Sequence, residues 1–248
     1  MTANSSAAAS AAAGAGVAAQ PTSPEAAVRR RQWLLILLAV NSGAIDAVGY
    51  TLLGGSFTSV MTGNMILLGV SIGEAERSLA LRAALALVCF IAGVALGARI
   101  ARSPQKGDSI WPAPVALAVR VELGLLAVFS IGWWTASGHP TGAAQPLLLG
   151  VGAVALGLQS SAVLRFGVSG LSTTYMTGTL TTLVSALANG KHPRNVLPSM
   201  QILAGILLGA IAATLLARHA PLWIPALELI PVGCAVFNPI TRTRVSSQ

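Results

Sequence analysis

Three acidic residues lie within long apolar stretches of the chain, where a charged group is costly. They are Asp46, Glu122 and Glu228. An ionisable side chain at membrane depth costs at least about 2.5–3.5 kcal/mol, so such groups normally face a bundle interior or a cavity and mark an ion pathway or a proton relay. Asp46 has Gly43 and Gly49 about one turn to either side, which leaves room for a solute or a neighbouring backbone. We therefore expect Asp46 to have the functional role.

Two other polar residues, Asn41 and Arg120, interrupt the same stretches. Arg120 and Glu122 are two residues apart, which directs them to different sides of a helix. Arg120 lies about 10 Å from the start of its stretch at 1.5 Å per residue, so it can snorkel to the surface or form a structural pair. We predict Arg120, Glu122 and Glu228 as intramembrane charges and Asn41 as a pathway residue, with fixed structural pairing as the alternative.

Two short polar segments, 57–73 and 171–188, repeat a Thr-Gly motif after a glycine break. A break at membrane depth frees backbone groups that protein, water or a ligand must satisfy, so a pseudo-symmetric site for an ion or polar solute is predicted there. The alternative is that the Thr hydroxyls bond to their own helix and the glycines allow close helix contact. The predicted pathway residues of this set are Thr62, Gly63, Asn64, Gln159, Thr177, Gly178 and Thr179.

The composition of the 248 residues is that of a membrane protein. Hydrophobic residues make up 54% and charged residues 9%, against roughly 25% charged in soluble domains. The net charge of +8 comes mostly from cations at the edges of apolar runs, as expected of loops that set membrane topology. A soluble enzyme, a nucleic-acid binder and a disordered chain are thereby excluded, and the lipid bilayer is the expected partner.

The elements that must position these residues are all helical. The apolar segments are about 33–53, 57–73, 80–100, 113–134, 147–164, 171–188, 198–217 and 221–238. Segments 57–73 and 171–188 are at the lower end of the ~17–25 residues that cross hydrocarbon. We expect six spanning helices plus two short broken or re-entrant segments, with eight or seven full spans as the alternative.

An internal repeat relates the two halves of the chain. Met61-Thr62-Gly63 recurs 115 residues later, and Ala92-Gly93 recurs as Ala204-Gly205. The expected organisation is a disordered low-complexity tail, two membrane repeats and a short cytoplasmic tail, at 1–28, 29–136, 145–239 and 240–248.

The loop cations favour repeats that run in opposite directions. Two re-entrant segments put eleven loop cations on one side and three on the other, against nine and five for eight spans. Three spans per half is an odd number, so the halves are inverted, which is an architecture of transporters. Both termini are then expected in the cytoplasm.

Sequence motifs for catalysis or metal binding are weak. Residues 69–73 fit the G-x-S-x-G pattern, but a serine nucleophile needs a positioned base, and His139, His192 and His219 all fall in predicted loops or helix ends. The sequence has no H-E-x-x-H, Walker A or Cys-His metal motif. We expect no enzyme activity, no cofactor and no metal.

An ordered set of motifs resembles the YoaK family of bacterial membrane proteins. The motifs are the runs 43–49, 54–57, 61–64, 157–159 and 177–179. The resemblance covers roughly residues 33–238 and implies a multi-spanning protein of the bacterial inner membrane that transports small metabolites. Asp46, Thr62, Gly63, Asn64, Gln159, Thr177 and Gly178 match the family pattern, whereas Ser161 stands where the second half would repeat Asp46.

The function expected from these features is that of a secondary transporter or permease for a small metabolite, proton-coupled through Asp46. Transporters of this architecture form their substrate and ion sites at the midplane between the repeats. The alternative is a non-transporting scaffold or accessory subunit, whose small-residue helices bind a partner. Such helix faces could also join copies of the chain, so a homo-oligomer is a further possible partner state.

Overall fold

The computed structural model describes residues 24–101, 112–164, 176–190 and 192–237. These residues form eight α-helices and one 3-10 turn, with no strand among them. The helices are α1 (Pro24–Leu52), α2 (Met61–Gly73), α3 (Arg77–Ala101), α4 (Ala113–Thr135), α5 (Ala144–Leu164), α6 (Met176–Ala188), α7 (Pro193–His219), η1 (Pro221–Trp223) and α8 (Ile224–Phe237). The prediction of an all-α protein is therefore confirmed.

Five of the described helices are long and apolar enough to cross a bilayer. They are α1, α3, α4, α5 and α7, with apolar spans of 21 to 25 residues. The sixth predicted span, η1 with α8, covers only Pro221–Phe237. A helix of that length reaches about 25 Å, less than the ~30 Å of a typical hydrocarbon core. The count of six spans thus stays a prediction.

Large apolar side chains remain exposed along the outside of the bundle, as expected where lipid is the solvent. On α3, Val88 is 65% and Ile91 63% exposed, and on α7 Leu207 is 62% exposed. A water-soluble protein rarely leaves so many contiguous apolar side chains uncovered. The exterior of the bundle therefore fits a membrane environment.

Helix ends differ from the predicted segments, most clearly at the starts of α1 and α2. Helix α1 already begins at Pro24, within the predicted tail, where a proline is tolerated because the first turn needs no amide hydrogen. Helix α2 begins at Met61 rather than at 57, because Gly54 and Gly55 adopt positive φ and break the helix. Residues 1–23, 171–175 and 238–248 of the predicted tails and second polar segment lie outside the described residues.

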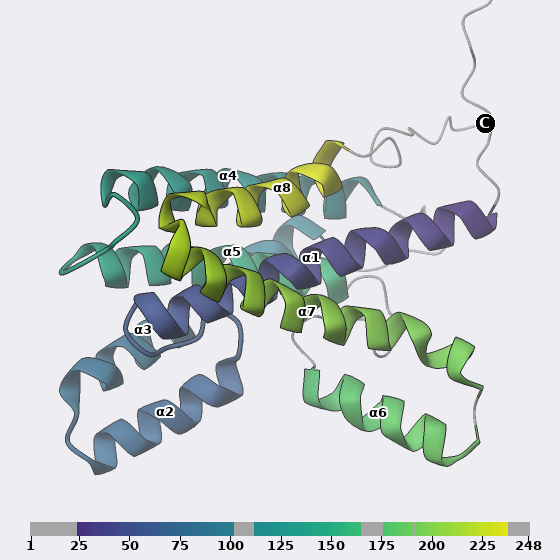
Figure 1. The fold of residues 1–248 in the computed structure, drawn as a ribbon, viewed down its shortest axis with the longest axis horizontal. Coiled ribbons are helices and arrows are strands. Elements are labelled where there is room, and N and C mark those ends of the chain that lie inside the picture. Colours follow the sequence, from purple (N-terminus) through teal and green to yellow (C-terminus); the bar gives the residue numbers. More distant parts are fainter. Residues whose placement is uncertain (1–23, 102–111, 165–175, 191, 238–248) are drawn as a thin grey trace, which may run out of the picture.

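The two short helices run from the middle of the molecule to opposite ends (Figure 1). Helix α2 runs toward the end at which α1 finishes and α3 begins. Helix α6 runs toward the other end, where α7 begins. Each short helix therefore leaves the bundle at one end without crossing it.

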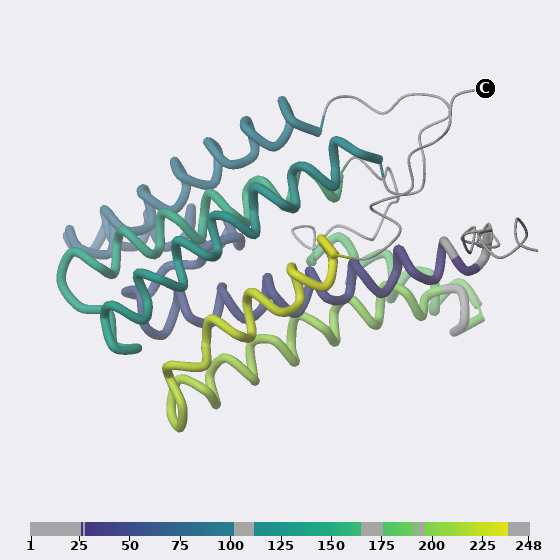
Figure 2. The backbone as a smooth tube through the Cα atoms, turned by 90° about the horizontal axis from the view of Figure 1, so that it is seen from above, coloured from purple at the N-terminus to yellow at the C-terminus, as the bar shows by residue number. Residues whose placement is uncertain are grey.

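Glycines allow two pairs of long helices to approach closely: α1 with α7 and α3 with α5. The α1–α7 pair is visible side by side in Figure 1 and Figure 2. A Cβ atom at each of four glycines would collide with a backbone oxygen of the opposite helix, so close approach requires glycine there. The glycine and facing residue are Gly43 with Ile206 and Gly209 with Val40 between α1 and α7, and Gly93 with Val154 and Gly157 with Phe90 between α3 and α5.

A layer formed by α4 and α8 covers the inner helices. Helix α4 packs on α5 and α8, and α8 also packs on α1. Trp133 on α4 is fully buried, and its indole Nε1–H donates to the carbonyl oxygen of Pro221 at 2.8 Å. This bond ties the end of α4 to the start of η1, so the two outer helices are fixed to each other at that end of the bundle.

Candidate functional site

The carboxylate of Asp46 holds the connection between α1 and α2. Its Oδ1 accepts hydrogen bonds from the backbone N–H groups of Thr58 at 2.8 Å and Ser59 at 2.7 Å, and from the Thr58 hydroxyl at 2.9 Å. Its Oδ2 accepts from the Ser59 hydroxyl at 2.5 Å. Asp46 is 7% exposed, so these four donors replace most of its hydration.

A second side chain closes the same connection from the α2 side. The Asn64 Oδ1 accepts from the Phe57 N–H at 2.9 Å, and the Asn64 Nδ2 donates to the Phe57 oxygen at 2.6 Å. Asn64 is fully buried. The hydroxyls of Ser42 and Ser59 also share a hydrogen bond of 3.2 Å. The non-helical chain before α2 is thus held to both of its neighbouring helices.

A separate polar cluster joins α1, α4 and α5 in the core. The Asn41 Nδ2 donates to Glu122 Oε1 and to Gln159 Oε1, each at 3.3 Å. The Gln159 Nε2 donates to the Leu38 oxygen, also at 3.3 Å. Asn41 and Glu122 are fully buried and Gln159 is 1% exposed. Three residues that the sequence marked separately are therefore brought together, away from the hydrogen bonds of Asp46.

Several buried oxygens of this cluster and of Glu228 on α8 have no hydrogen-bond partner. They are Asn41 Oδ1, Glu122 Oε2 and both carboxyl oxygens of Glu228. Glu228 lies at the boundary between the two apolar clusters of the core, since Ile224 one turn before it belongs to one and Val232 one turn after it belongs to the other. Buried polar groups in proteins are normally bonded, so these acceptors require an explanation.

The two Thr-Gly motifs occupy equivalent positions, because Thr62 and Thr177 are each the second residue of a short helix. Both threonines are exposed. Thr179 is 2% exposed, and its hydroxyl has no partner. The helices that carry the motifs start in the middle of the molecule (Figure 1). Among the described residues, no hydrogen bond joins the two motifs to each other or to Asp46, so their convergence stays a prediction.

Comparison with known proteins decides the family. A family described as "protein of unknown function (DUF1275)" matches residues 34–237. The chain belongs to the DUF1275 family. It is also 29% identical over 210 residues to the UPF0700 transmembrane protein YoaK of Bacillus subtilis strain 168, a match that covers 80% of this chain and 91% of that protein. No solved structure matches the chain.

The predicted membership in the YoaK family is confirmed, and with it the transmembrane character of this DUF1275 protein. The match spans all the described helices except the first turns of α1. The transmembrane relative and the apolar helices together make the chain a multi-pass membrane protein.

The remaining residues predicted from the sequence make none of the side-chain hydrogen bonds of these two clusters. Arg120 is exposed on α4, as expected of a side chain that snorkels. Gly63 is half-buried and faces the Phe57 ring, whereas Gly178 is exposed. The hydroxyl of Ser71, the serine of the G-x-S-x-G pattern, donates to the Leu67 carbonyl of its own helix at 2.6 Å.

Sequence reasoning did not assign Thr58 and Ser59 as partners of Asp46. Both are polar residues in an apolar segment, shortly after the glycine pair Gly54-Gly55. That pattern could have indicated an interruption between two helices that is held by side-chain hydrogen bonds.

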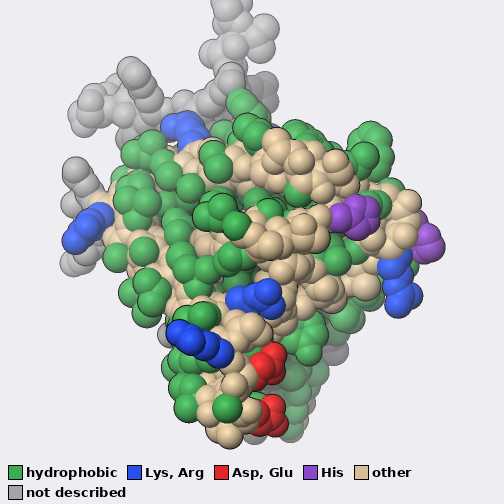
Figure 3. Space-filling view, turned by 90° about the vertical axis from the view of Figure 1, so that its left-hand side faces the viewer, with side chains coloured by type: hydrophobic (Ala, Val, Ile, Leu, Met, Phe, Trp, Pro, Cys, Tyr) green, Lys and Arg blue, Asp and Glu red, His purple; other side chains and the backbone are tan. Residues whose placement is uncertain are grey.

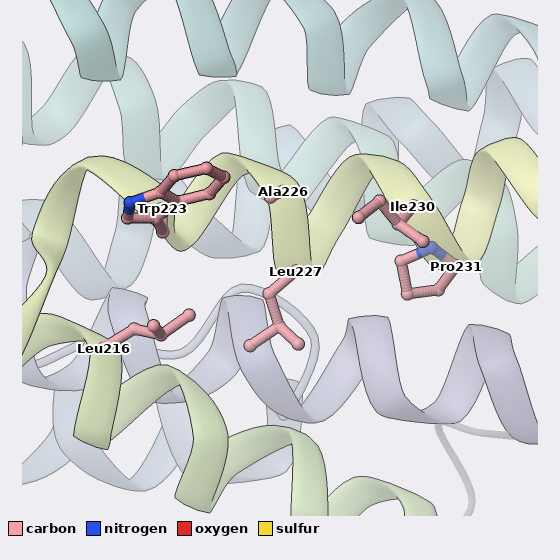
Figure 4. A pocket seen from close by; sticks show the side chains of 6 residues that line it. All are labelled: Leu216, Trp223, Ala226, Leu227, Ile230 and Pro231. Carbon is pink, nitrogen blue, oxygen red and sulfur yellow. The ribbon is translucent and has the colours of Figure 1, made fainter.

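A shallow apolar groove on the outside of the DUF1275 fold has a volume of about 330 Å³ (Figure 4). None of the residues predicted from the sequence lines it. Its side chains come from α7, η1 and α8 and are Leu216, Trp223, Ala226, Leu227, Ile230 and Pro231. A wholly apolar lining suits lipid chains and offers no polar group to orient a metabolite.

Proposed function

We propose that this protein is a secondary transporter or permease for a small metabolite in the bacterial plasma membrane. The observation that carries the proposal is the pair of short helices, α2 and α6, which start in the middle of the bundle and leave at opposite ends. Transporters built from inverted repeats use such broken helices to form substrate and ion sites near the midplane.

The glycine contacts support two inverted halves. The contact of Gly43 with Ile206 corresponds to that of Gly157 with Phe90, and the contact of Gly209 with Val40 corresponds to that of Gly93 with Val154. One shift of 114 residues relates α1 to α5, and one shift of 116 relates α3 to α7, in both correspondences. The same two offsets in residue number thus occur in two independent helix contacts. That agreement is expected if the two halves repeat one structural unit, and is not expected of unrelated helices.

Asp46 is the proposed coupling carboxylate, and its hydrogen bonds suggest how coupling works. As an anion it can accept from all four donors of Thr58 and Ser59 at once. A proton on either oxygen removes the charge that strengthens these bonds and turns one acceptor into a donor. Proton binding would then loosen the chain before α2, the helix that carries the predicted pathway residue Thr62.

Charge placement supports an orientation with both termini in the cytoplasm. Arg29, Arg30 and Arg31 lie at the end of the bundle where α1 begins. The opposite end carries the exposed acidic residues of the α2–α3 connection, Glu74 and Glu76, together with the exposed Arg77 and Arg218. Figure 3 shows acidic and basic side chains side by side on this face. Positive residues concentrate on the cytoplasmic side, so the first of these ends is assigned inside.

The scaffold alternative has less support. It requires faces of small residues that are free to bind a partner. Gly93 and Gly97 of α3 are buried against α5, and Gly205 and Gly209 of α7 are buried against α1. These glycine faces are therefore already occupied within the chain.

The test is electrogenic or solute flux in proteoliposomes that contain the purified full chain. Rapid addition of single compounds from a panel of amino acids, carboxylates, sugars and nucleosides is expected to give protein-dependent currents or uptake for one class. Asp46→Asn is expected to abolish proton-coupled flux, whereas Glu74→Gln, at an exposed position in the α2–α3 connection, is expected to retain it. Coupled flux that is unchanged in Asp46→Asn would overturn the role of Asp46.

A further inference from the structure

The buried cluster of Asn41, Glu122 and Gln159 contains two side-chain oxygens that have no hydrogen-bond partner. Each Asn side chain has two N–H donors and one carbonyl acceptor. The Asn41 Nδ2 donates to two partners, Glu122 Oε1 and Gln159 Oε1. What remains without a partner is Asn41 Oδ1 and Glu122 Oε2, and both are acceptors. A cation or a proton is the ligand that these two acceptors fit, whereas Gln159 Nε2, which bonds once to the Leu38 oxygen, keeps one spare N–H donor in the same cluster.

The charge balance points the same way. Glu122 is fully buried, and an anionic carboxylate in such surroundings is very costly unless a cation compensates it. Among the arginines of the described residues, Arg120 is exposed and lies two positions before Glu122 on the same helix, so it points elsewhere. Arg82 donates to the oxygens of Gly54 and Gln145 at the end of the bundle. Neither of these two arginines compensates Glu122, and a cation or a proton from solution would supply the missing positive charge.

We propose that Asn41 Oδ1 and Glu122 Oε2 belong to a binding site for a small monovalent cation, a proton or a sodium ion, in the core between α1, α4 and α5. Both oxygens are fully buried, and Asn41 is held toward Glu122 and Gln159 by its two hydrogen bonds. Asn41 also lies 13 residues into the span Val28–Leu52, close to its middle. The site is thus deep in the membrane.

The site joins the two halves of the chain, because Asn41 and Glu122 come from the first and Gln159 from the second. A cation bound there acts on the contact between halves, which is where coupling ions act in inverted-repeat transporters. The coupling role rests on the proposed transport function, but cation binding itself can be measured without any flux.

Other ionisable groups surround Glu122 on the helices packed near it. Helix α5 has none, and the further buried carboxyls are Glu228 on α8 and Asp46 on α1. Among the described side chains, the remaining ionisable groups of these helices are Arg29, Arg30, Arg31 and Tyr50 on α1, Arg77, Arg82, Cys89 and Arg99 on α3, Arg120 on α4 itself, and Cys234 on α8. Asp46 is already bonded to Thr58 and Ser59, so a titration that depends on Glu122 has to be separated from Glu228 by mutation.

The experiment measures the Tm of the purified full chain by tryptophan fluorescence. One arm exchanges choline chloride for sodium chloride at constant pH and ionic strength, and the other lowers the pH in choline chloride. If the cation is sodium, the Tm is expected to rise in the first arm, and if it is a proton, in the second. The expected rise is about 5–10 °C at a hundredfold excess of the cation over its Kd. Glu122→Gln is expected to lose this shift, while Glu74→Gln and Glu228→Gln are expected to keep it. An equal shift in wild type and Glu122→Gln overturns the proposal.

Chemical labelling of the wild-type chain provides a second test. It needs no variant, so misfolding of a variant cannot explain its result. Dicyclohexylcarbodiimide reacts with protonated carboxyls in apolar surroundings, and mass spectrometry locates the adduct. Labelling of Glu122 is expected to fall in sodium chloride or at raised pH, and labelling that is indifferent to both overturns the site. Proteoliposomes without flux but with the cation effect would contradict only the transport function, and flux without the cation effect would contradict only this site.

Discussion

Ser59 binds Asp46 twice, through its backbone N–H to Oδ1 at 2.7 Å and through its hydroxyl to Oδ2 at 2.5 Å. Asp46 lies six residues before the end of α1, and Ser59 follows that end by seven residues. The two contacts therefore fold the chain back along α1 after the helix has ended. This return places the start of α2 in the middle of the bundle instead of at its edge.

Replacing Asp46 with Asn should weaken the hydrogen bonds that hold the α1–α2 connection and so lower the stability of the protein. The amide keeps one acceptor oxygen but presents an N–H₂ group to donors that need an acceptor. Hydrogen bonds to charged groups contribute about 1.5–3 kcal/mol each, and we expect a loss in that range. The measurement is denaturant or thermal unfolding in detergent. Glu74→Gln is the matched control, because it removes an exposed charge from the neighbouring α2–α3 connection. Wild-type stability of Asp46→Asn would contradict the bracing role.

Asn64→Ala should release the other side of the same connection. The change removes the donor and the acceptor that bind both backbone groups of Phe57, at 2.6 and 2.9 Å. A buried backbone group that loses its partner costs about 1–3 kcal/mol. We expect lower stability and faster proteolysis within residues 53–60, mapped by mass spectrometry. Asn189→Ala serves as the control, since Asn189 is exposed at the end of α6; equal proteolysis of both variants would exclude the effect.

The sequence was sufficient to place helices and to mark unusual residues, but it could not identify their partners. An acid in an apolar stretch predicts burial, and Asp46, Glu122 and Glu228 are all buried. The partners of Asp46 depend on the path of residues 53–60, which has no periodic pattern to read. Asn41 meets Glu122 and Gln159 across 81 and 118 residues, a separation that only the packing of α1, α4 and α5 resolves.

Helix register was another feature that the sequence could not determine. Identity of residues aligned Gly93 with Gly205. In the structure the counterpart of Gly93 at the close helix contact is Gly209, one turn further along α7. Glycines four residues apart occupy the same face of a helix, so the sequence pattern fits either register, and the backbone of the opposing helix decides between them.

The close helix contacts predict opposite outcomes for two Gly→Ala changes. At Gly43 a Cβ would collide with the backbone oxygen of Ile206, which cannot move without its helix, so we expect Gly43→Ala to lose about 1–3 kcal/mol. At Gly124 on α4 no atom lies within 4 Å of the added Cβ, and alanine favours the helix by up to about 1 kcal/mol. Unfolding of both variants in detergent checks the sign; a neutral Gly43→Ala would refute the contact.

Side-specific cysteine labelling distinguishes re-entrant segments from eight spans. In a chain with Cys89→Ala and Cys234→Ser, single cysteines replace Arg29, Glu74 or His139, all of which are exposed. A membrane-impermeant maleimide added to sealed vesicles reports which side each position faces. If α2 is re-entrant, positions 74 and 139 face the side opposite to position 29.

Eight full spans would instead put positions 29, 74 and 139 on one side, because residues 57–73 would then cross the bilayer. The re-entrant outcome is expected from the length of α2, whose 13 helical residues reach about 20 Å, well short of the ~30 Å hydrocarbon core. The Asp46 and Asn64 contacts keep residues 57–59 folded against α1 and α2, so these residues cannot extend α2 across the membrane. Labelling of position 74 from the same side as position 29 would therefore contradict both the topology and the bracing of the α1–α2 connection.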